Sequence, residues 1–286
     1  MILFNKNKVA FRLASTLISI TAVSGCAVFE KSVNDTDSVA GVRTDAHECS
    51  QQLVASDRAT GGELDSESIR LVNWNIQKGG DPRWTTDLTK LEGNPDLIIL
   101  QEAPLKSDAW DFLSSDQHHS FSPGYRTRHS LTGVMTVSNV KPLTQCNLVS
   151  VEPWIRSPKA SLITEYGLSN SDETLLVVNI HAVNFTFGMH DFHKQFKQTF
   201  SVLNDHAGPI LVSGDFNTWN WRRTDVLEEL TDALGLEMLG YDEDHRKRFM
   251  GQALDHIYVR GLEVLEATTL QADSSDHNPM SVLLRL

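Results

Sequence analysis

Residues that can do chemistry gather in five short phrases of this 286-residue chain, each beside a short apolar run. The phrases are Asn73-Trp74-Asn75-Ile76, Leu100-Gln101-Glu102, Gly214-Asp215-Phe216-Asn217, Leu254-Asp255-His256-Ile257 and Ser275-Asp276-His277-Asn278-Pro279. Short apolar runs are typical of buried strands, and loops at strand ends collect polar groups around one pocket. Acids, amides and an imidazole brought together in this way predict a metal-dependent hydrolase of phosphoesters.

Glu102 and Asn75 are the predicted metal-site pair. Hydrolysis of a phosphoester needs a cation on the phosphoryl oxygens, a positioned water with a base, and donors to the charge that builds in the transition state. Mg²⁺ prefers carboxylate and water ligands and usually takes only one or two protein carboxylates. Glu102 supplies such a carboxylate, and Asn75 adds an amide oxygen without adding negative charge.

Asp215 and Asn217 stand two residues apart, so in an extended strand both side chains point the same way while Phe216 points into the core. We expect Asp215 to orient or deprotonate the attacking water and Asn217 to donate to a phosphate oxygen. Gly214 permits a close approach of the backbone. Taken alone, this phrase is more typical of a turn than of a site, because Gly-Asp and Asn-Thr pairs are common turn chemistry.

His277 is the predicted donor to the developing oxyanion, and Asp255 is its predicted partner, because a nearby carboxylate holds an imidazole protonated. His181 follows an apolar run in the other half of the chain. By itself it is typical of a hydrogen-bonded surface histidine, but beside the other phrases it is a predicted second donor. His256 alternates away from Asp255 and is predicted to be structural.

Three further residues near these phrases are candidates for substrate contact, each with a competing interpretation. Lys78 suits contact with a phosphate, and it equally suits a solvated loop. Trp219 and Arg222, with their neighbours Trp221 and Arg223, fit stacking on a base or gripping a second phosphate. The same side chains also fit a structural cap on the fold, and the sequence leaves both interpretations open.

Phe185 and Phe187 come just after His181. Two aromatic side chains at this place suit contact with lipid in a membrane-tethered enzyme. They also suit ordinary packing within a loop, and the sequence does not decide between these roles.

The elements that must position the phrases alternate between strand and helix. The apolar run at 97–100 is typical of a strand buried on both faces. Apolar residues at steps of three and four predict helices around 84–91, 192–203 and 226–234. Two facing sheets with helices outside fit this count. The predicted strands are 69–76, 97–100, 133–138, 160–166, 174–180, 209–213, 254–259, 263–270 and 280–286.

The N-terminal segment predicts export. Three cations, the last of them Arg12, precede the apolar segment Leu13–Val23, which is too short for a comfortable membrane span, so residues 1–25 are a predicted signal peptide. Small residues directly before Cys26 resemble the bacterial lipoprotein box, which implies cleavage there and lipidation of that cysteine. An ordinary secretory signal is the alternative. Ala27 implies, by analogy with Gram-negative lipoproteins, an outer-membrane anchor facing the periplasm.

Residues 26–68 are rich in Ser, Thr, Asp and Glu and are predicted to form a lipid-anchored polar linker before a catalytic domain at 69–286, which we expect to be a monomer. The formal charge of −12 becomes −15 when the three cations of the signal peptide are removed. This charge argues against tight non-specific binding of nucleic acid, which depends on Lys and Arg neutralising phosphates. It does not exclude a nuclease, because a bound divalent cation supplies local positive charge.

Two cysteines, Cys49 and Cys146, remain in the predicted mature chain besides the lipidated one. In an oxidising compartment they could form a disulfide that joins the linker to the body. Two unpaired thiols are the alternative, and the sequence leaves the choice open.

Taken in order along the chain, the phrases resemble those of the endonuclease/exonuclease/phosphatase superfamily, which includes DNase I. The resemblance spans about residues 69–286. It implies a four-layered α/β sandwich, in which helices flank two facing mixed sheets, and Mg²⁺-assisted in-line attack of water on phosphorus, with Mn²⁺ as a substitute ion. It implies a metal site at Asn75, Glu102 and Asp276 and catalytic roles for His181, Asp215, Asn217, Asp255 and His277.

Within this class we expect a phosphodiesterase with nuclease-like machinery that acts on nucleic acid or nucleotide phosphodiesters. Phospholipid head groups, as in sphingomyelinases, and sugar phosphates are alternative substrates. A catalytically silent binding lipoprotein of the same fold is a second alternative. Such a protein should have lost at least one charged site residue, and this chain keeps Glu102, Asp215, Asp255, Asp276 and His277.

Overall fold

The computed structural model describes residues 44–54, 56–91, 94–105, 110, 116–127 and 130–286. The predicted signal peptide and Cys26 lie outside these residues. Within the described part of the chain, no helix is both long enough and apolar enough to cross a membrane.

A six-stranded mixed sheet, the first sheet, carries the first two polar phrases. Its central strands β2 and β3 run parallel, with Asn75 beside Gln101, so the two phrases lie together at one end of the sheet. Antiparallel strands extend it on both sides. In spatial order the strands are β14 (Glu263–Thr269), β15 (Met280–Arg285), β2 (Ile69–Asn75), β3 (Leu97–Pro104), β5 (Leu131–Ser138) and β4 (His118–Arg126).

A seven-stranded mixed sheet, the second sheet, carries the other strand-borne phrases. Strands β8 and β9 run parallel, and β13 lies antiparallel to β9. A two-stranded hairpin of β11 (Arg248–Phe249) and β12 (Gln252–Ala253) precedes β13. In spatial order the strands are β1 (Glu63–Leu64), β7 (Pro158–Leu168), β8 (Thr174–His181), β9 (Ile210–Asp215), β13 (Asp255–Arg260) and β10 (Glu237–Met238), with β6 (Thr144–Val151) also paired to β7.

Apolar cores between the sheets and outside each sheet separate four layers, because successive side chains of a strand point to opposite faces. In β2, Ile69 and Leu71 pack in the core between the two sheets, whereas Val72 and Trp74 pack in the core outside the first sheet. β8 divides in the same way, with Val177 in the inter-sheet core and Val178 in the core outside the second sheet.

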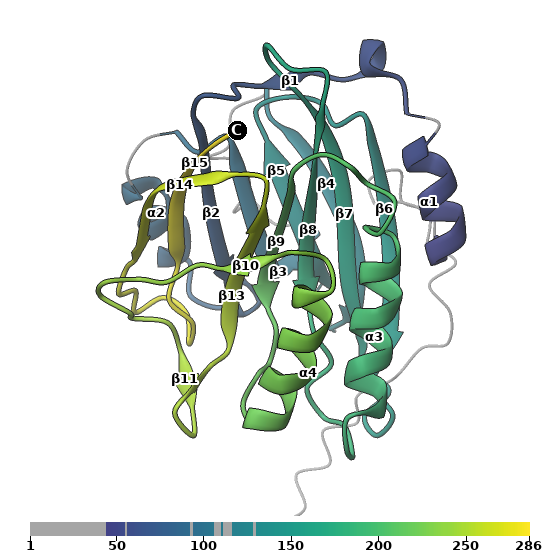
Figure 1. Cartoon of the computed structure of the whole chain (residues 1–286). Helices are drawn as coiled ribbons and strands as arrows, with labels where there is room; N and C mark the ends of the chain where they lie inside the picture. The colour runs from purple at the N-terminus through teal and green to yellow at the C-terminus, as the bar shows by residue number, and fades with distance from the viewer. Residues whose placement is uncertain (1–43, 55, 92–93, 106–109, 111–115, 128–129) are drawn as a thin grey trace, which may run out of the picture. The chain divides into compact units, whose positions relative to one another are not determined.

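Helices close the two outer cores. On the second sheet lie α3 (His190–Ser201) and α4 (Trp221–Asp232), which are side by side in Figure 1, and on the first sheet lies α2 (Arg83–Lys90). The phenylalanines of α3 are fully or almost fully buried, as their helical spacing predicts. The predicted four-layered α/β sandwich is therefore confirmed.

Regular secondary structure is present before residue 69, where the sequence predicts the catalytic domain to begin. Within the predicted linker 26–68 the structure contains α1 (Ala46–Val54), the 3₁₀ turn η1 (Arg58–Thr60) and β1, which pairs with β7. A disulfide joins Cys49 of α1 to Cys146 of β6, so the bridged alternative is the one observed. It closes a separation of 97 residues, which in the chain-entropy model stabilises the fold by on the order of 4–5 kcal/mol. The linker prediction was therefore wrong for the segment that contains α1, η1 and β1. The disulfide holds the short helix α1 on the body, and such a helix shows little apolar periodicity in the sequence.

Candidate active site

Strand alternation turns four of the predicted site residues into the space between the sheets. In β2, β8, β9 and β13 the inward-facing positions are the odd-numbered ones, since those residues form the inter-sheet core. Continued to the end of each strand, this alternation places Asn75, His181, Asp215 and Asp255 on the inner face. Register then makes them neighbours, because His181 pairs with Asp215 and Asp215 pairs with Asp255.

Asp215 lies at the centre of this group and is almost fully buried. Its Oδ2 accepts a hydrogen bond from Asn75 Nδ2 at 3.0 Å, and its Oδ1 accepts one from the backbone N–H of Asn217 at 3.0 Å. His181 Nε2 and His277 Nε2 lie 3.5 and 3.9 Å from the same Oδ2. Burial raises the pKa of Asp215, and the charge of His277 opposes that shift. This carboxylate is placed to accept a proton.

Gly214 makes the join between β8 and β9 possible. A Cβ at this position would lie 2.0 Å from the carbonyl oxygen of Ile180, which no side-chain atom can tolerate. The backbones therefore approach closely only because residue 214 is glycine, as the sequence suggested.

His277 is held by Asp255, as predicted. His277 Nδ1 lies 2.7 Å from Asp255 Oδ2, and both side chains are buried. Burial lowers the pKa of His277, but the charges of Asp255 and Asp215 outweigh it and raise the pKa to about 10. A protonated imidazole with Nδ1 on Asp255 leaves its Nε2–H free to donate toward the centre of the site.

His181 is held by a cation instead. Its Nε2 lies 2.7 Å from the Nζ of Lys159, a buried residue of β7 that the sequence did not single out. Burial and the charge of Lys159 lower the pKa of His181 well below its usual value. A neutral His181 accepts from Lys159 through Nε2, so on this side of the site the group placed to donate is Lys159 Nζ.

Glu102 lies at the outer edge of the site on a bulge of β3, where its φ is 54°. Its Oε2 accepts from the hydroxyl of Tyr125 at 3.3 Å and lies 3.4 Å from Lys78 Nζ. Its Oε1 is 4.0 Å from His181 Nε2, which joins this edge to the rest of the site. Lys78, one of the substrate-contact candidates, is thus at the edge of the site, with its ammonium on a site carboxylate.

The donor set fits a hard divalent cation. Glu102 and Asn75 offer oxygen ligands at one edge, and Asn75 Oδ1, which accepts from the Gln77 N–H at 3.1 Å, keeps a second lone pair. On spacing alone, ligand atoms of Asp215, Asp255 and His277 also lie within 4.8 Å of one another. The direct bond between Asp255 and His277 already engages two of these three groups.

Other predicted residues take different places. Asn217 is buried and donates through Nδ2 to the Ala182 carbonyl, so in this arrangement its amide holds the backbone after β8. Asp276 is exposed beside His277, and its metal-side role stays a prediction. His256 is buried against Phe216, with Nε2 2.7 Å from the Thr218 hydroxyl, which fits the structural role predicted for it.

The Trp219–Arg223 cluster divides between the two interpretations. Arg223 is fully buried and donates to the carbonyls of Val183, Asn184 and Asn217, so it holds loops together and is not free to grip a phosphate. Trp219 is partly buried against its guanidinium. Arg222 is exposed, and its guanidinium lies over the ring of Trp221, which is not a site residue.

A buried amide network forms the floor beneath the site and joins the sheets. Gln101 Nε2 on the first sheet donates to Asn73 Oδ1 and to Asn179 Oδ1 on the second sheet, both at 2.9 Å. Asn179 in turn donates to the carbonyls of Leu100 and Met135. Buried polar networks of this kind fix one alignment of packed layers, here the alignment that brings the two halves of the site together.

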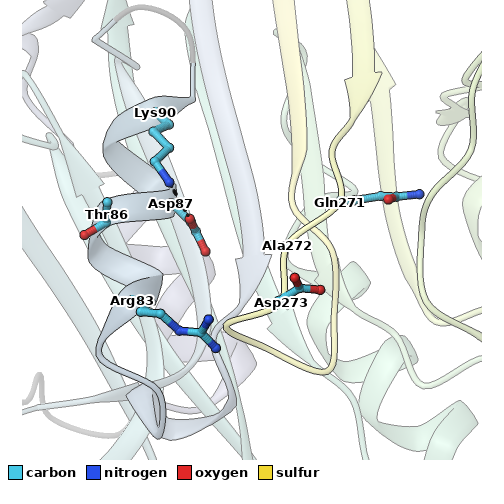
Figure 2. Close-up of a pocket in the computed structure, with 7 residues that line it drawn as sticks. All are labelled: Arg83, Thr86, Asp87, Lys90, Gln271, Ala272 and Asp273. Atoms are coloured by element: carbon cyan, nitrogen blue, oxygen red, sulfur yellow. Dashed lines mark hydrogen bonds and ion pairs between the residues drawn. The ribbon is translucent and has the colours of Figure 1, made fainter.

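A separate surface pocket of about 280 Å³ lies between α2 and the loop that precedes β15 (Figure 2). Asp87 in this pocket accepts from the Ser274 hydroxyl at 2.7 Å and pairs with Lys90. None of its lining residues belongs to the site described above. The pocket is lined by Arg83, Thr86, Asp87, Lys90, Gln271, Ala272 and Asp273.

Comparison with known proteins identifies the chain's relatives. A profile of the Endonuclease/Exonuclease/phosphatase family matches residues 72–277, which is most of the body. The chain belongs to this family. Members of the Endonuclease/Exonuclease/phosphatase family are hydrolases of phosphoester bonds, so the fold and the reaction class expected from the sequence agree with the family.

Bacterial UPF0294 proteins are similar in sequence to this chain over most of its length. A UPF0294 protein of Vibrio vulnificus is 38% identical over 243 residues, covering 82% of this chain and 84% of the relative. A UPF0294 protein of Photorhabdus laumondii is 35% identical over 218 residues, covering 76% and 84%.

Solved structures of the Endonuclease/Exonuclease/phosphatase family share the fold. The human Nocturnin catalytic domain with a bound sulfate anion aligns with a TM-score of 0.61 and 19% identity over 78% of this chain and 96% of that domain. Danio rerio TDP2 complexed with a single-strand DNA product aligns with a TM-score of 0.53 and 13% identity, covering 77% and 99%.

Proposed function

We propose that the protein is a Mg²⁺-dependent phosphodiesterase with nuclease-like machinery. The observation that carries this proposal is the buried Asp215 carboxylate, which accepts from Asn75 and has an imidazole on each side within 4 Å of one oxygen. A carboxylate so placed can take a proton from water, and cationic donors beside it can stabilise the charge on a phosphoryl group.

Glu102 and Asn75 would hold the cation, which when bound neutralises charge on the phosphoryl oxygens; Mn²⁺ could replace Mg²⁺. Asp215 then orients a water whose oxygen attacks phosphorus, and its carboxylate accepts the proton released. The bond from phosphorus to the leaving oxygen breaks, and that oxygen leaves as an alcohol once a water supplies a proton. His277 Nε2 and Lys159 Nζ, held by Asp255 and His181, are the donors we propose for the equatorial oxygens.

Nucleic acid or nucleotide phosphodiesters are the substrate class we propose. The single-strand DNA product bound to the TDP2 relative supports this choice, since the same fold there accommodates a nucleic-acid strand. The acidic charge of the chain argues for a substrate held mainly in the site rather than along an extended basic surface.

Phospholipids are a second candidate substrate class. Exposed aromatic side chains on the loops that adjoin the Lys159 and His181 strands, Trp154 and Phe187, favour it, because such residues contact lipid at membrane interfaces. We also propose export and an outer-membrane lipid anchor at Cys26, supported by the sequence around that residue.

Protein lacking residues 1–25 tests the reaction on single-stranded DNA, RNA, sphingomyelin and a chromogenic phosphodiester, each with Mg²⁺ and with EDTA. We expect turnover that EDTA abolishes and that the Asp215→Asn variant lacks. No metal-dependent turnover on any of the four substrates would favour the silent binding lipoprotein instead.

A further inference from the structure

Exposed apolar side chains gather on two loops that border the His181 side of the site. The loop between β6 and β7 presents Trp154 and Ile155, 63% and 44% exposed, and the loop between β8 and α3 presents Phe185 and Phe187, 59% and 72% exposed. We call these four residues the aromatic rim. Its loops adjoin the ends of the strands that carry Lys159 and His181, so the rim lies at the same end of the second sheet as these two site residues.

The aromatic rim is fixed in place by buried polar groups. Glu152 is fully buried, and its Oε1 accepts from the backbone N–H groups of Asn184 and Phe185, which ties the two loops together. The rings of Trp154 and Phe187 pack with centroids 4.3 Å apart. These contacts fix the conformation of both loops, so the exposure of their aromatic side chains does not result from loose packing.

A second brace comes from α4. The Nη2 of Arg223 donates to the Asn184 carbonyl and to the Thr186 hydroxyl, on both sides of Phe185. The buried guanidinium therefore sets the conformation from which the rim's phenylalanines project.

The charge around the aromatic rim differs from that of the chain as a whole. Segments 151–157 and 184–190 contain one carboxylate, Glu152, and it is fully buried, although the whole chain carries a net charge of −12. Arg156 in the first loop is exposed. An apolar surface with an exposed cation and without exposed acids suits an anionic lipid surface.

Exposed apolar residues also occupy the other segments that adjoin site strands. Trp221, 61% exposed, begins α4 just after the Asp215 phrase, and Met250, 81% exposed, tops the β11 hairpin just before β13. Figure 1 shows this hairpin and the first turns of α3 and α4 at the same end of the sheets. The end that holds the site is thus the end with the most prominent apolar side chains.

The described chain begins close to the rim. Thr44 pairs with Asn147 of β6 through backbone and side-chain hydrogen bonds. Val151, where β6 ends and the first rim loop begins, is four residues further, about 13 Å at a rise of ~3.3 Å per residue. The described part of the chain therefore begins beside the strand that leads into the rim.

We propose that the aromatic rim rests on the surface of a lipid bilayer and keeps the entrance of the active site toward it. Aromatic side chains are favoured at the boundary between head groups and hydrocarbon, where their rings lose water contact. The contact concerns the surface beside the site and does not depend on which phosphoester is hydrolysed.

Site-specific fluorescence in protein that lacks residues 1–25 and carries Cys26→Ser tests the contact separately from any N-terminal anchor. In this protein, Phe187→Cys is labelled with an environment-sensitive fluorophore, and Leu265→Cys, an exposed apolar position of β14, is the matched control. With vesicles of phosphatidylethanolamine and phosphatidylglycerol, we expect the label at 187 to shift to the blue and to be quenched by spin-labelled lipid, and the label at 265 to stay unchanged. No response at 187, or equal responses at both positions, would overturn the proposal.

Two further measurements separate the lipid surface from other partners. In protein that lacks residues 1–25 and carries Cys26→Ser, the double substitution Trp154→Ser with Phe187→Ser should weaken partition onto vesicles by at least about tenfold and leave turnover of a soluble phosphodiester unchanged. A response of the 187 label to a single-stranded oligonucleotide but not to vesicles would assign the rim to nucleic acid and also overturn the proposal.

Discussion

The two sides of Asp215 use the same residue type in opposite ways. His277 and His181 both bring Nε2 within 4 Å of Asp215 Oδ2, and both are buried. Asp255 pairs with His277 and Lys159 pairs with His181. Burial lowers the pKa of each imidazole, but the carboxylates raise the pKa of His277 to about 10, whereas Lys159 lowers the pKa of His181 further.

This difference shows that the partner, and not the histidine, decides the chemistry of each side. On one side a carboxylate makes the imidazole itself the cationic donor. On the other side the imidazole is an acceptor that positions a buried ammonium, and the ammonium is the donor. Each substitution below removes one of these relations.

Asp215→Asn should have the largest effect, because it removes the proton acceptor that both sides share. We expect kcat for a chromogenic phosphodiester to fall by about 10³- to 10⁴-fold, with the melting temperature kept or raised because a buried charge is lost. Asp205→Asn, at an exposed position, is the matched control and should leave kcat unchanged. A fall of less than tenfold would remove Asp215 from its proposed role.

Asp255→Asn should convert the His277 side toward the behaviour of an ordinary histidine. We expect a fall in kcat of about 10²-fold, because the amide leaves the imidazole without its charged partner. The protonated donor persists in the parent until the pH rises toward 10, so activity in the variant should be lost at a lower pH, nearer 6.5. Parallel pH profiles for parent and variant would contradict this.

Glu102→Gln should act on metal affinity. Loss of one carboxylate from the cation site should weaken Mg²⁺ binding by about 10- to 100-fold. Titration calorimetry with Mg²⁺ measures this without turnover. Glu173→Gln is a matched surface control, and equal affinities in the two variants would place the ion elsewhere.

Lys159→Met should break the His181 side alone. We expect kcat/KM to fall by about tenfold or more through lost contact with the substrate phosphate, while Mg²⁺ affinity stays unchanged. Lys159→Arg should recover part of the loss, since it restores a cation. If Lys159 has only a structural role, both variants should change the melting temperature equally, and Lys159→Arg should not recover kcat/KM.

The fold was largely predictable from the sequence. Of the two pairs beside Asp215, the sequence predicted Asp255–His277 and did not predict Lys159–His181. Alternation and apolar runs locate the strands whose odd positions face inward, and the Asp255–His277 pair followed from two recognisable phrases. Lys159 gave no such signal. Lys159 occupies an odd-numbered position of β7, as does Ile163, which packs in the core with the phenylalanines of α3. Alternation therefore predicts that Lys159 faces α3, whereas its Nζ lies 2.7 Å from His181 Nε2.

The aromatic and charged cluster after Asp215 shows the opposite limit. Arg223 is of a residue type that often binds phosphate, yet it is fully buried and donates its hydrogen bonds to loop carbonyls. Composition cannot distinguish these uses, because the acceptors come from residues up to 40 positions away.

His256 differs from the two site histidines because its role is structural, and we expect its replacement to have the smallest effect. It is buried among Thr218, Phe216, Tyr258 and Arg246, and burial with the charge of Arg246 lowers its pKa to about 3. The unfolded chain takes up a proton near pH 6.5 that the folded chain refuses, so stability falls as the pH drops from about 6.5 to 3.

Replacing it tests that linkage. His256→Gln should reduce the slope of unfolding free energy against pH in this window by up to about 1.4 kcal/mol per pH unit, measured by urea denaturation. Nearby Asp244, whose pKa is lowered to about 2 chiefly by its hydrogen bond from Arg246, keeps its charge throughout most of the window in both proteins. An unaltered slope would show that His256 is protonated in the fold.

The position of the bound ion and phosphate tests the arrangement around Asp215 most directly. Crystals grown with Mn²⁺ and inorganic phosphate should show an anomalous peak about 2.0–2.2 Å from a Glu102 carboxylate oxygen. Phosphate oxygens should contact both His277 Nε2 and Lys159 Nζ. An ion bound between Asp255 and His277 would contradict the proposed metal site at Glu102. A phosphate that contacts neither His277 Nε2 nor Lys159 Nζ would contradict the proposed role of these two groups as donors.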